Sequence, residues 1–190
     1  MTTLAPTLYV RTFPRMASWL RDLMLIALGA LFVTVLAQVK IPLPFTPVPL
    51  TGQTFGVLLV AAALGAKRGA ASMAFYIALG AFGLPIFAGG ASGMAYLSGA
   101  TFGYLIGFVV SAYVVGWLAE RGLERNIRTS VIPFLAGTVI IYACGVSWLA
   151  VIFGSFGKAL AAGLVPFVVG DVIKLVAAAL TLPTVWKLVK

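Results

Sequence analysis

Residues 164–185 read LVPFVVGDVIKLVAAALTLPTV, an apolar run in which Asp171 and Lys174 are the only ionisable side chains. About 20 apolar residues are enough to cross the hydrocarbon core of a bilayer as a helix. A charge at that depth costs roughly 2.5–3.5 kcal/mol on insertion scales, so charged residues in spans usually face the bundle interior and pair there. The i, i+3 spacing of Asp171 and Lys174 places both groups on one face of a helix. The run therefore predicts a membrane span that carries a functional polar pair.

The whole chain has the composition of an integral membrane protein. Its 190 residues are 62% hydrophobic and 9% charged, and the mean hydropathy is +1.13. A soluble domain needs more polar surface than this composition supplies. No linker, internal repeat or low-complexity tail divides the sequence, so we expect an all-α fold of one membrane domain over residues 1–190. Apolar stretches between polar or Pro/Gly-rich segments predict six transmembrane helices, at about 19–39, 50–66, 69–87, 97–119, 131–153 and 165–187.

The basic residues fall mainly on one side of these six spans. Lys and Arg accumulate on the cytoplasmic side of membrane proteins. With the N-terminus inside, the outer loops hold only Lys40 and Lys158, and six spans place both termini in the cytoplasm. The net charge of +9 then reflects orientation and contact with membrane lipid, and the scattered charges do not indicate a nucleic-acid partner. The predicted cytoplasmic segments hold Arg11, Arg15, Arg21, Lys67, Arg68, Arg121, Arg125, Arg128, Lys187 and Lys190.

The ionisable residues offer little catalytic chemistry. The sequence contains four carboxylates, one cysteine and no histidine, and Asp171 is the only carboxylate that lies more than a few residues inside a predicted span. Hydrolysis or phosphoryl transfer generally needs paired acids, a metal cluster, or a nucleophile with its base. We therefore expect no catalytic residue, no metal site and no cofactor of the protein's own, which disfavours a small intramembrane enzyme. A GxxxxGK[ST] phosphate loop is absent from the sequence, so any ATP would be used by partner subunits.

Two outer loops are placed to cover Asp171 and Lys174. Residues 40–51 contain four prolines, which favour a stiff, extended loop that could form a lid, and Gln53 follows at the mouth of the second span. The turn at residues 85–93 is rich in glycine, which exposes backbone amides to a ligand at close range. A carboxylate beside an ammonium suits a neutral polar group such as a urea. The alternatives are an Asp171–Lys174 pair that only braces the helices, and loops that are ordinary polar surface.

Two stripes of small residues predict close helix packing. In the fourth span Gly99, Gly103, Gly107 and Ser111 recur every four residues, which favours packing against a neighbouring helix. In the first span small residues fall at i, i+3, i+7 and i+10. They could serve the protein's own bundle or the docking of a separate membrane subunit, and the sequence leaves both open. The members of this second stripe are Ala27, Ala30, Thr34 and Ala37.

Four motifs occur in order along the chain: TPVPLTGQT at residues 46–54, GLPIFAGG at 83–90, GYLIGF at 103–108 and GDVIK at 170–174. Together they resemble the BioY family, the biotin-binding S component of energy-coupling factor (ECF) vitamin transporters. The resemblance implies a six-helix S-component fold that captures biotin from outside with high affinity. It also implies partnership with a transmembrane coupling subunit and two cytosolic ABC ATPases. The alternatives are a stand-alone biotin transporter, which could be homodimeric, and a purely structural membrane subunit.

The resemblance also implies roles for individual residues. Asp171 and Lys174 match the acid and lysine that contact biotin in the family, and we expect them at the ureido head. Gln53 matches the polar position that opens the second span, while Gly89 and Gly90 match glycines that shape the pocket. The small-residue stripe of the first span is the expected docking face for the coupling subunit. Aromatic contacts to the bicyclic ring and a loop hydroxyl complete the expected substrate-binding set: Asp171, Lys174, Gln53, Phe87, Gly89, Gly90, Ser92 and Tyr104.

Overall fold

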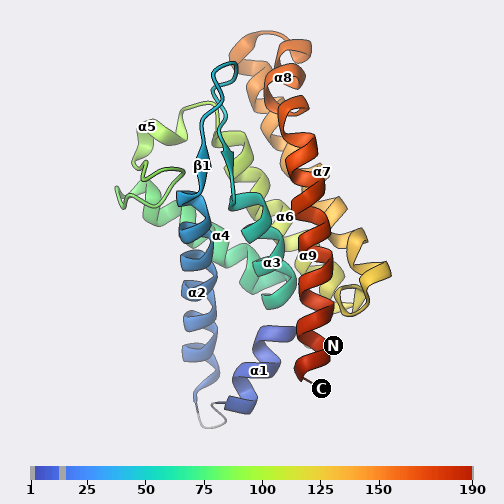
Figure 1. Cartoon of the computed structure of the whole chain (residues 1–190). Coiled ribbons are helices and arrows are strands. Elements are labelled where there is room, and N and C mark those ends of the chain that lie inside the picture. Colours follow the sequence, from blue (N-terminus) through green and yellow to red (C-terminus); the bar gives the residue numbers. More distant parts are fainter. Residues whose placement is uncertain (1–2, 13–15, 190) are drawn as a thin grey trace.

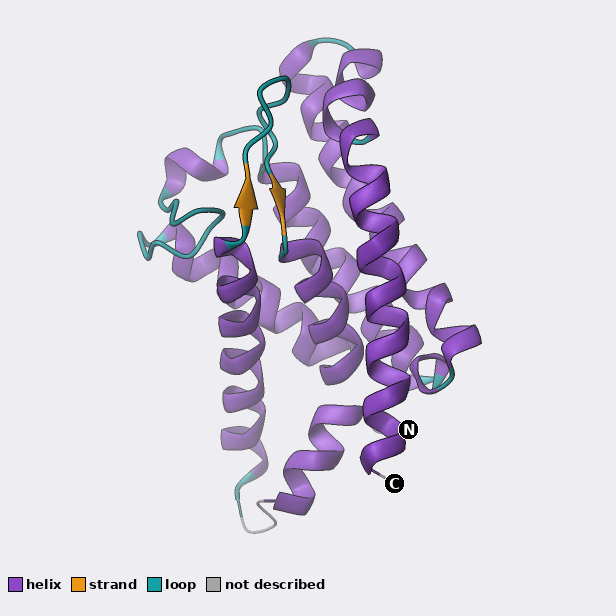
Figure 2. Cartoon of the chain, in the orientation of Figure 1, coloured by secondary structure: helices purple, strands orange, loops and turns teal. Residues whose placement is uncertain are grey.

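The computed structural model describes residues 3–12 and 16–189, and over this part the chain is almost entirely helical (Figure 2). Arg15 and Lys190 of the predicted cytoplasmic set lie outside the described residues, as does the side chain of Arg11. Within the described part, four helical segments are long and apolar enough to cross a membrane: Ser18–Gln38, Phe102–Glu120, Ile127–Phe153 and Phe156–Lys187. The protein is therefore an all-helical, multi-pass membrane protein, as the hydropathy predicted.

Helix α6 lies at the centre of the bundle and packs against α3, α4 and α7 (Figure 1). The first helix α1 and the last turns of α9 lie at one end, and the β1–β2 hairpin and α8 lie at the other. The described elements are α1 (Leu4–Thr12), α2 (Ser18–Gln38), β1 (Lys40–Ile41), β2 (Leu50–Thr51), α3 (Gln53–Leu64), α4 (Ala66–Ala81), α5 (Met94–Leu97), α6 (Phe102–Glu120), the 3-10 turn η1 (Leu123–Arg125), α7 (Ile127–Phe153), α8 (Phe156–Gly163), the 3-10 turn η2 (Val165–Phe167) and α9 (Val168–Val189).

The small-residue stripe of α6 is a contact surface for α7, as predicted. A Cβ atom on Gly103 would lie 2.3 Å from the Cβ of Trp148, and one on Gly107 would lie 2.9 Å from the Cα of Ile141. Neither position has room for a larger side chain. The two helices therefore approach almost backbone to backbone, which maximises their van der Waals contact.

The second and third predicted spans are shorter helices than expected. α3 has 12 residues and α4 has 16. At 1.5 Å per residue they are about 18 and 24 Å long, less than the ~30 Å of a hydrocarbon core. The prediction for α3 was too long because residues 50–51 pair as strand β2 and because Gly65, with φ +87°, ends the helix. A carboxylate oxygen of Glu120 then caps α4 by accepting the Ala66 N–H at 2.9 Å.

The Pro-rich segment forms a β-hairpin, with Lys40 opposite Thr51 and Ile41 opposite Leu50. Its tip is fastened to the end of α8, where the Thr46 hydroxyl donates to the Ala162 carbonyl at 2.7 Å. Hydropathy predicted neither this strand pair nor the separate helix α8. The sixth predicted span is likewise only part of a longer helical run, which is interrupted at η2 before α9 begins.

The stripe on α2 packs mainly inside the protein's own bundle. Ala30 and Ala37 are 2% and 0% exposed, Thr34 is half-buried, and Ala27 alone of the four is exposed. The stripe is inward because Gly29, beside Ala30, lets α4 approach: a Cβ on Gly29 would lie 2.6 Å from the Ser72 hydroxyl. The fold itself covers Ala30 and Ala37, so within the predicted docking face only Ala27 and part of Thr34 are accessible.

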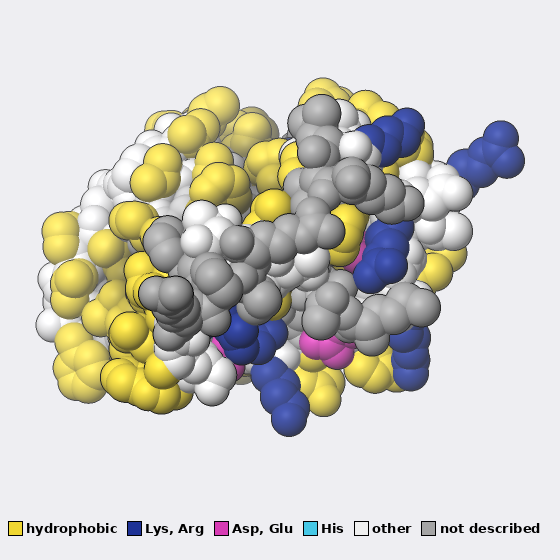
Figure 3. Space-filling view, turned by 90° about the horizontal axis from the view of Figure 1, so that it is seen from below, with side chains coloured by type: hydrophobic (Ala, Val, Ile, Leu, Met, Phe, Trp, Pro, Cys, Tyr) yellow, Lys and Arg dark blue, Asp and Glu magenta, His cyan; other side chains and the backbone are white. Residues whose placement is uncertain are grey.

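Basic side chains gather at the end of the bundle that carries α1 and the last turns of α9 (Figure 3). An ion pair joins two helices there, since Arg68 Nε of α4 lies 2.8 Å from Asp22 Oδ1 of α2. In η1 the side chain of Glu124 is completely buried, with Arg125 Nε 3.6 Å from its carboxylate. Burial raises the pKa of Glu124 above its ordinary value.

Candidate functional site

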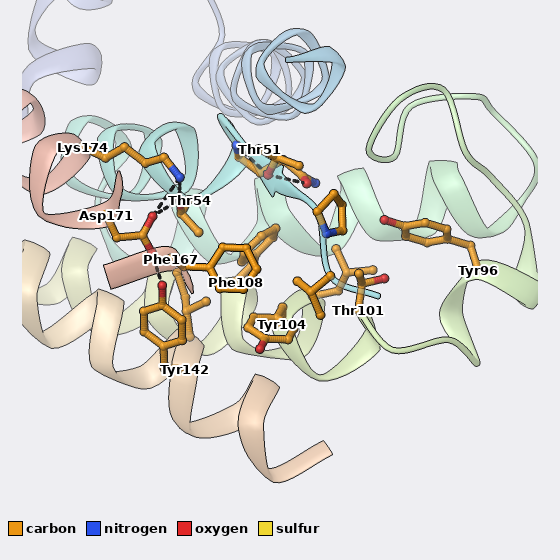
Figure 4. A pocket seen from close by; sticks show the side chains of 15 residues that line it. Thr51, Thr54, Tyr96, Thr101, Tyr104, Phe108, Tyr142, Phe167, Asp171 and Lys174 are labelled. Carbon is orange, nitrogen blue, oxygen red and sulfur yellow. Dashed lines mark hydrogen bonds and ion pairs between the residues drawn. The ribbon is translucent and has the colours of Figure 1, made fainter. Parts of the chain in front are cut away.

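A cavity lies below the hairpin, between α3, α6, α7 and α9 (Figure 4). Its empty volume is about 540 Å³, including the part open to solvent. We call it the main cavity, and its lining residues are Val48, Pro49, Thr51, Gln53, Thr54, Tyr96, Thr101, Tyr104, Leu105, Phe108, Ile141, Tyr142, Phe167, Asp171 and Lys174.

The predicted polar pair lies at one end of the main cavity. Asp171 is in the first turn of α9, where the helix dipole favours a carboxylate, and Lys174 follows one turn later. Lys174 Nζ lies 2.8 Å from Asp171 Oδ1 and donates to the Thr54 hydroxyl of α3 at 3.1 Å. On the other side, the Tyr142 hydroxyl of α7 donates to Asp171 Oδ2 at 2.5 Å. Side chains from three helices thus converge on a single carboxylate.

This arrangement leaves Asp171 with limited capacity for a further donor. An ionised carboxylate can accept about four hydrogen bonds. Lys174, Tyr142 and the Thr54 hydroxyl, at 3.4 Å, already supply three donors. The pair braces α3, α7 and α9, and it also lines the main cavity. With opposite charges 2.8 Å apart, it presents an acceptor and a donor without net charge.

Aromatic and aliphatic side chains form the walls beside the polar pair. Phe108 and Phe167 are 3% and 5% exposed, and Tyr104 is 8% exposed. The Tyr104 hydroxyl donates to the Gly163 carbonyl at 2.7 Å, so its polar end is already satisfied and its ring is left to line the cavity. Tyr104 also packs edge-on against Tyr142, with ring centroids 6.4 Å apart. These walls suit a compact apolar ring system.

Gln53 lines the main cavity as predicted, but its amide is already engaged. Its Nε2 donates to the Tyr76 hydroxyl at 2.8 Å, and its Oε1 accepts from the Thr51 hydroxyl at 3.0 Å. The Tyr76 hydroxyl in turn donates to the Ile86 carbonyl at 3.1 Å. Gln53 therefore ties the start of α3 to α4 and to the 83–93 loop, and keeps one amide hydrogen for another partner.

Phe87 does not line the main cavity. It is 0% exposed and packs between two tyrosines, edge-on to Tyr76 at 5.5 Å and stacked on Tyr96 at 4.8 Å between ring centroids. Tyr96 is the ring that faces the cavity. The expected contact of Phe87 with a ligand therefore has no support from the cavity lining, and the Phe87 ring packs behind Tyr96 instead.

Three further predicted residues lie in the 83–93 loop and outside the main cavity: Gly89, Gly90 and Ser92. The loop is anchored to the end of α2, because the Gly89 N–H donates to the Ala37 carbonyl at 3.1 Å. Both glycines have positive φ, +69° and +78°, which explains the residue type without a ligand. Their expected contact with substrate therefore has no support from the cavity lining.

Tyr142 is the main site residue that the sequence did not predict. It lies on α7, and nothing local connects it with Asp171, 29 residues further along the chain. A signal was nevertheless present, since a tyrosine hydroxyl inside an apolar span must find a hydrogen-bond partner. Tyr96, Phe108 and Phe167 carried no comparable signal, because aromatic residues are common throughout the spans.

The site offers the chemistry of binding. In the part of the chain that the structure describes, no three His, Cys, Asp or Glu side chains come close enough together to hold a metal ion. Asp171 has no second carboxylate among the residues that line the main cavity with it. A neutral polar group can bind at this end, with its donor on the carboxylate and its acceptor on the ammonium.

The helical fold and this cavity define a multi-pass membrane protein with a binding site for a small molecule. The family model described as the BioY family matches residues 6–190, and the chain belongs to that family. It is a family of transporter components and not of enzymes. The fold is that of an S component: a crystal structure of the S-component for biotin from an ECF-type ABC transporter superposes with a TM-score of 0.81 at 27% identity, covering 90% of this chain and 95% of that one.

Two relatives are similar over most of their length. The biotin transporter BioY of Rhizobium etli is 40% identical over 169 residues, which is 84% of this chain and 90% of the relative. The biotin transporter BioY of Thermotoga maritima is 43% identical over 156 residues, which is 82% of this chain and 91% of the relative.

Proposed function

We propose that this protein captures biotin from outside the cell as the substrate-binding component of an ECF-type importer. The observation that carries the proposal is the Asp171–Lys174 pair at the end of the main cavity. A ureido group has two N–H donors and one carbonyl acceptor, which match the carboxylate and the ammonium respectively. Family membership and the names of the relatives support biotin over other ureas.

The rest of the ligand fits the other walls of the main cavity. The bicyclic ring lies against Tyr104, Phe108 and Phe167, where its apolar surface leaves water. The ring of Tyr96 lies at the opposite end of the cavity from the polar pair (Figure 4). The ligand therefore lies lengthwise, with its ureido head at α9 and its side chain directed toward Tyr96.

We further propose that the chain is a single membrane domain that crosses the bilayer six times, with both termini in the cytoplasm. α3 and α4 supply the second and third crossings despite their length, because the hairpin and the 83–93 loop extend them at the outer end. The concentration of basic side chains at the opposite end supports this orientation (Figure 3). Lys40 and Lys158 lie at the hairpin end, in β1 and α8.

The proposed partners are a transmembrane coupling subunit and two cytosolic ABC ATPases, which would supply the energy for import. Of the small-residue stripe proposed for docking, Ala27 and the accessible part of Thr34 remain on the surface of α2. Large apolar side chains surround them on the same helix, including Leu23, Leu28 and Leu31, each more than half exposed. This face would contact either lipid or the coupling subunit.

Titration calorimetry on the purified protein tests the proposed ligand. We expect biotin to bind, desthiobiotin to bind more weakly because it lacks part of the ring system, and thiamine and riboflavin to give no heat. Binding of an unrelated vitamin in place of biotin would refute the proposal. Biotin uptake in cells with and without coupling and ATPase subunits then separates the importer component from the stand-alone transporter, which would need neither.

A further inference from the structure

We propose that Lys40 binds the carboxylate at the end of the biotin side chain, at the outer mouth of the main cavity. This inference rests on the proposed function and adds a second polar subsite to it. The observations that carry it are a second cavity that shares lining residues with the first, the pairing of Lys174 with Asp171, and the placement of Lys40 across Gly89.

The second cavity lies beside the hairpin and has an empty volume of about 810 Å³, including the part open to solvent. Lys40, Pro42 and Thr46 of the hairpin line one side of it. Three residues line both cavities: Pro49, Tyr96 and Thr101. The two spaces therefore adjoin where these residues lie.

The polar pair and this junction lie at opposite ends of the main cavity. Figure 4 shows Asp171 and Lys174 at one end and Thr101 and Tyr96 toward the other. A ligand whose head is held by Asp171 and Lys174 must extend its flexible side chain toward the junction. The end of that chain then enters the second cavity, on whose wall Lys40 lies.

Charge also directs the carboxylate away from the inner end. Lys174 already has a counter-ion, since its ammonium lies 2.8 Å from Asp171, so a second carboxylate there would face the negative charge of Asp171. A buried carboxylate without a partner is strongly unfavourable. Among the described Lys and Arg residues that line either cavity, Lys40 is the one not paired with a carboxylate, and Lys158 lines neither.

The Lys40 side chain lies across Gly89. Lys40 is paired with Thr51 in the hairpin, and its side chain crosses Gly89, where an added Cβ would lie 2.6 Å from Lys40 Cδ and 3.2 Å from Nζ. Gly89 is itself fixed by its hydrogen bond to Ala37. The family resemblance implied a pocket-shaping role for Gly89, and in this proposal Gly89 has that role because it leaves room for the Lys40 side chain.

The test compares biotin with biotinamide, which keeps the ring and chain but has no charge, on the purified full chain at low salt. We expect the wild type to prefer biotin about five- to tenfold, the range of a partly exposed charge-assisted contact. In Lys40→Gln the preference should disappear, with biotinamide affinity unchanged. Lys40→Arg should keep the preference, and Lys158→Gln is the matched control that removes an outer charge without touching either cavity.

The possible outcomes separate the inference from the proposed function. Failure of the wild type to bind biotin would refute the function itself. Biotin binding with an undiminished preference in Lys40→Gln would overturn the inference alone, and so would an equal loss of both ligands, which would indicate that Lys40 acts through the hairpin fold.

Two glycine variants provide an independent check. Gly89→Ala and Gly90→Ala both place alanine at a positive φ, but an added Cβ meets Lys40 at Gly89 and nothing within 4 Å at Gly90. We expect Gly89→Ala to reduce the biotin preference and Gly90→Ala to retain it. Equal effects of the two variants would contradict the placement of Lys40.

Discussion

Replacing Asp171 by Asn keeps the size of the side chain and removes the charge at the centre of the site. The carboxylate holds Lys174 at 2.8 Å and Tyr142 at 2.5 Å, and leaves about one acceptor position for a ligand N–H. Asn has a single acceptor oxygen, and its NH₂ group cannot accept a hydrogen bond from Lys174 or Tyr142. Losing one hydrogen bond to a charged acceptor costs about 1.5–3 kcal/mol. Biotin affinity should therefore fall roughly 10- to 150-fold.

Titration calorimetry with biotin measures the affinity of Asp171→Asn. A thermal unfolding transition first shows that the variant is folded. Asp22→Asn is the matched control, because it removes a carboxylate from an ion pair of the same 2.8 Å length, with Arg68, at the opposite end of the bundle. The control should bind biotin as the wild type does. If Asp171→Asn binds within about twofold of the wild type, a change of less than ~0.5 kcal/mol, the assignment of the site is wrong.

Three further predictions concern packing, the site and pH. Gly80→Ala should lower the melting temperature, because its Cβ would lie 2.2 Å from the buried Phe87 ring, whereas Gly157→Ala, which meets nothing within 4 Å in α8, should leave it unchanged or raise it. Tyr142→Phe should weaken biotin binding by less than loss of the carboxylate does, about three- to tenfold by calorimetry, since one orienting hydrogen bond is lost. Burial raises the folded-state pKa of Glu124, so the unfolded chain loses this proton first and stability falls as pH rises above about 4.5. In Glu124→Gln the melting temperature should not fall with pH in this range. If the melting temperature of the variant falls as much as that of the wild type, Glu124 is not the group responsible.

The polar pair could be predicted from sequence because its signal is local. Two charges one turn apart in an apolar run are costly, and they therefore indicate both a span and a site. The partnership of Tyr142 and Thr54 with Asp171 could not be predicted, since it depends on how α3, α7 and α9 converge. The cavity forms only where these helices meet, so no single stretch of sequence predicts it.

Phe87 shows what the same reasoning leaves out. An aromatic residue in a Gly-rich outer loop resembles a ligand contact, but Gly80 opens space for its ring inside the protein, and Tyr76 and Tyr96 enclose it. Whether a side chain faces a ligand or the core is decided by its neighbours in space.

Hydropathy predicted the positions of the helices along the chain well, but it did not predict the residues at which they begin and end. Strand β2 needs β1 as its partner, and hydropathy contains no information on pairing across the loop between them. The inward direction of Ala30 and Ala37 depends on the close approach of α4 at Gly29, which the small-residue pattern allowed but did not specify.

The fastening of the hairpin tip to α8 has a consequence for the rate of exchange. Val48 and Pro49 of the hairpin form part of the roof over the main cavity, and the hydrogen bond between Thr46 and Ala162 holds that roof against the neighbouring helix. We expect that breaking this bond speeds the entry and the departure of a ligand alike, because both require the roof to move. We expect the hydrogen bond between Thr46 and Ala162 to affect the residence time of the ligand more than its dissociation constant. The rate of vitamin uptake then depends on how often this bond breaks.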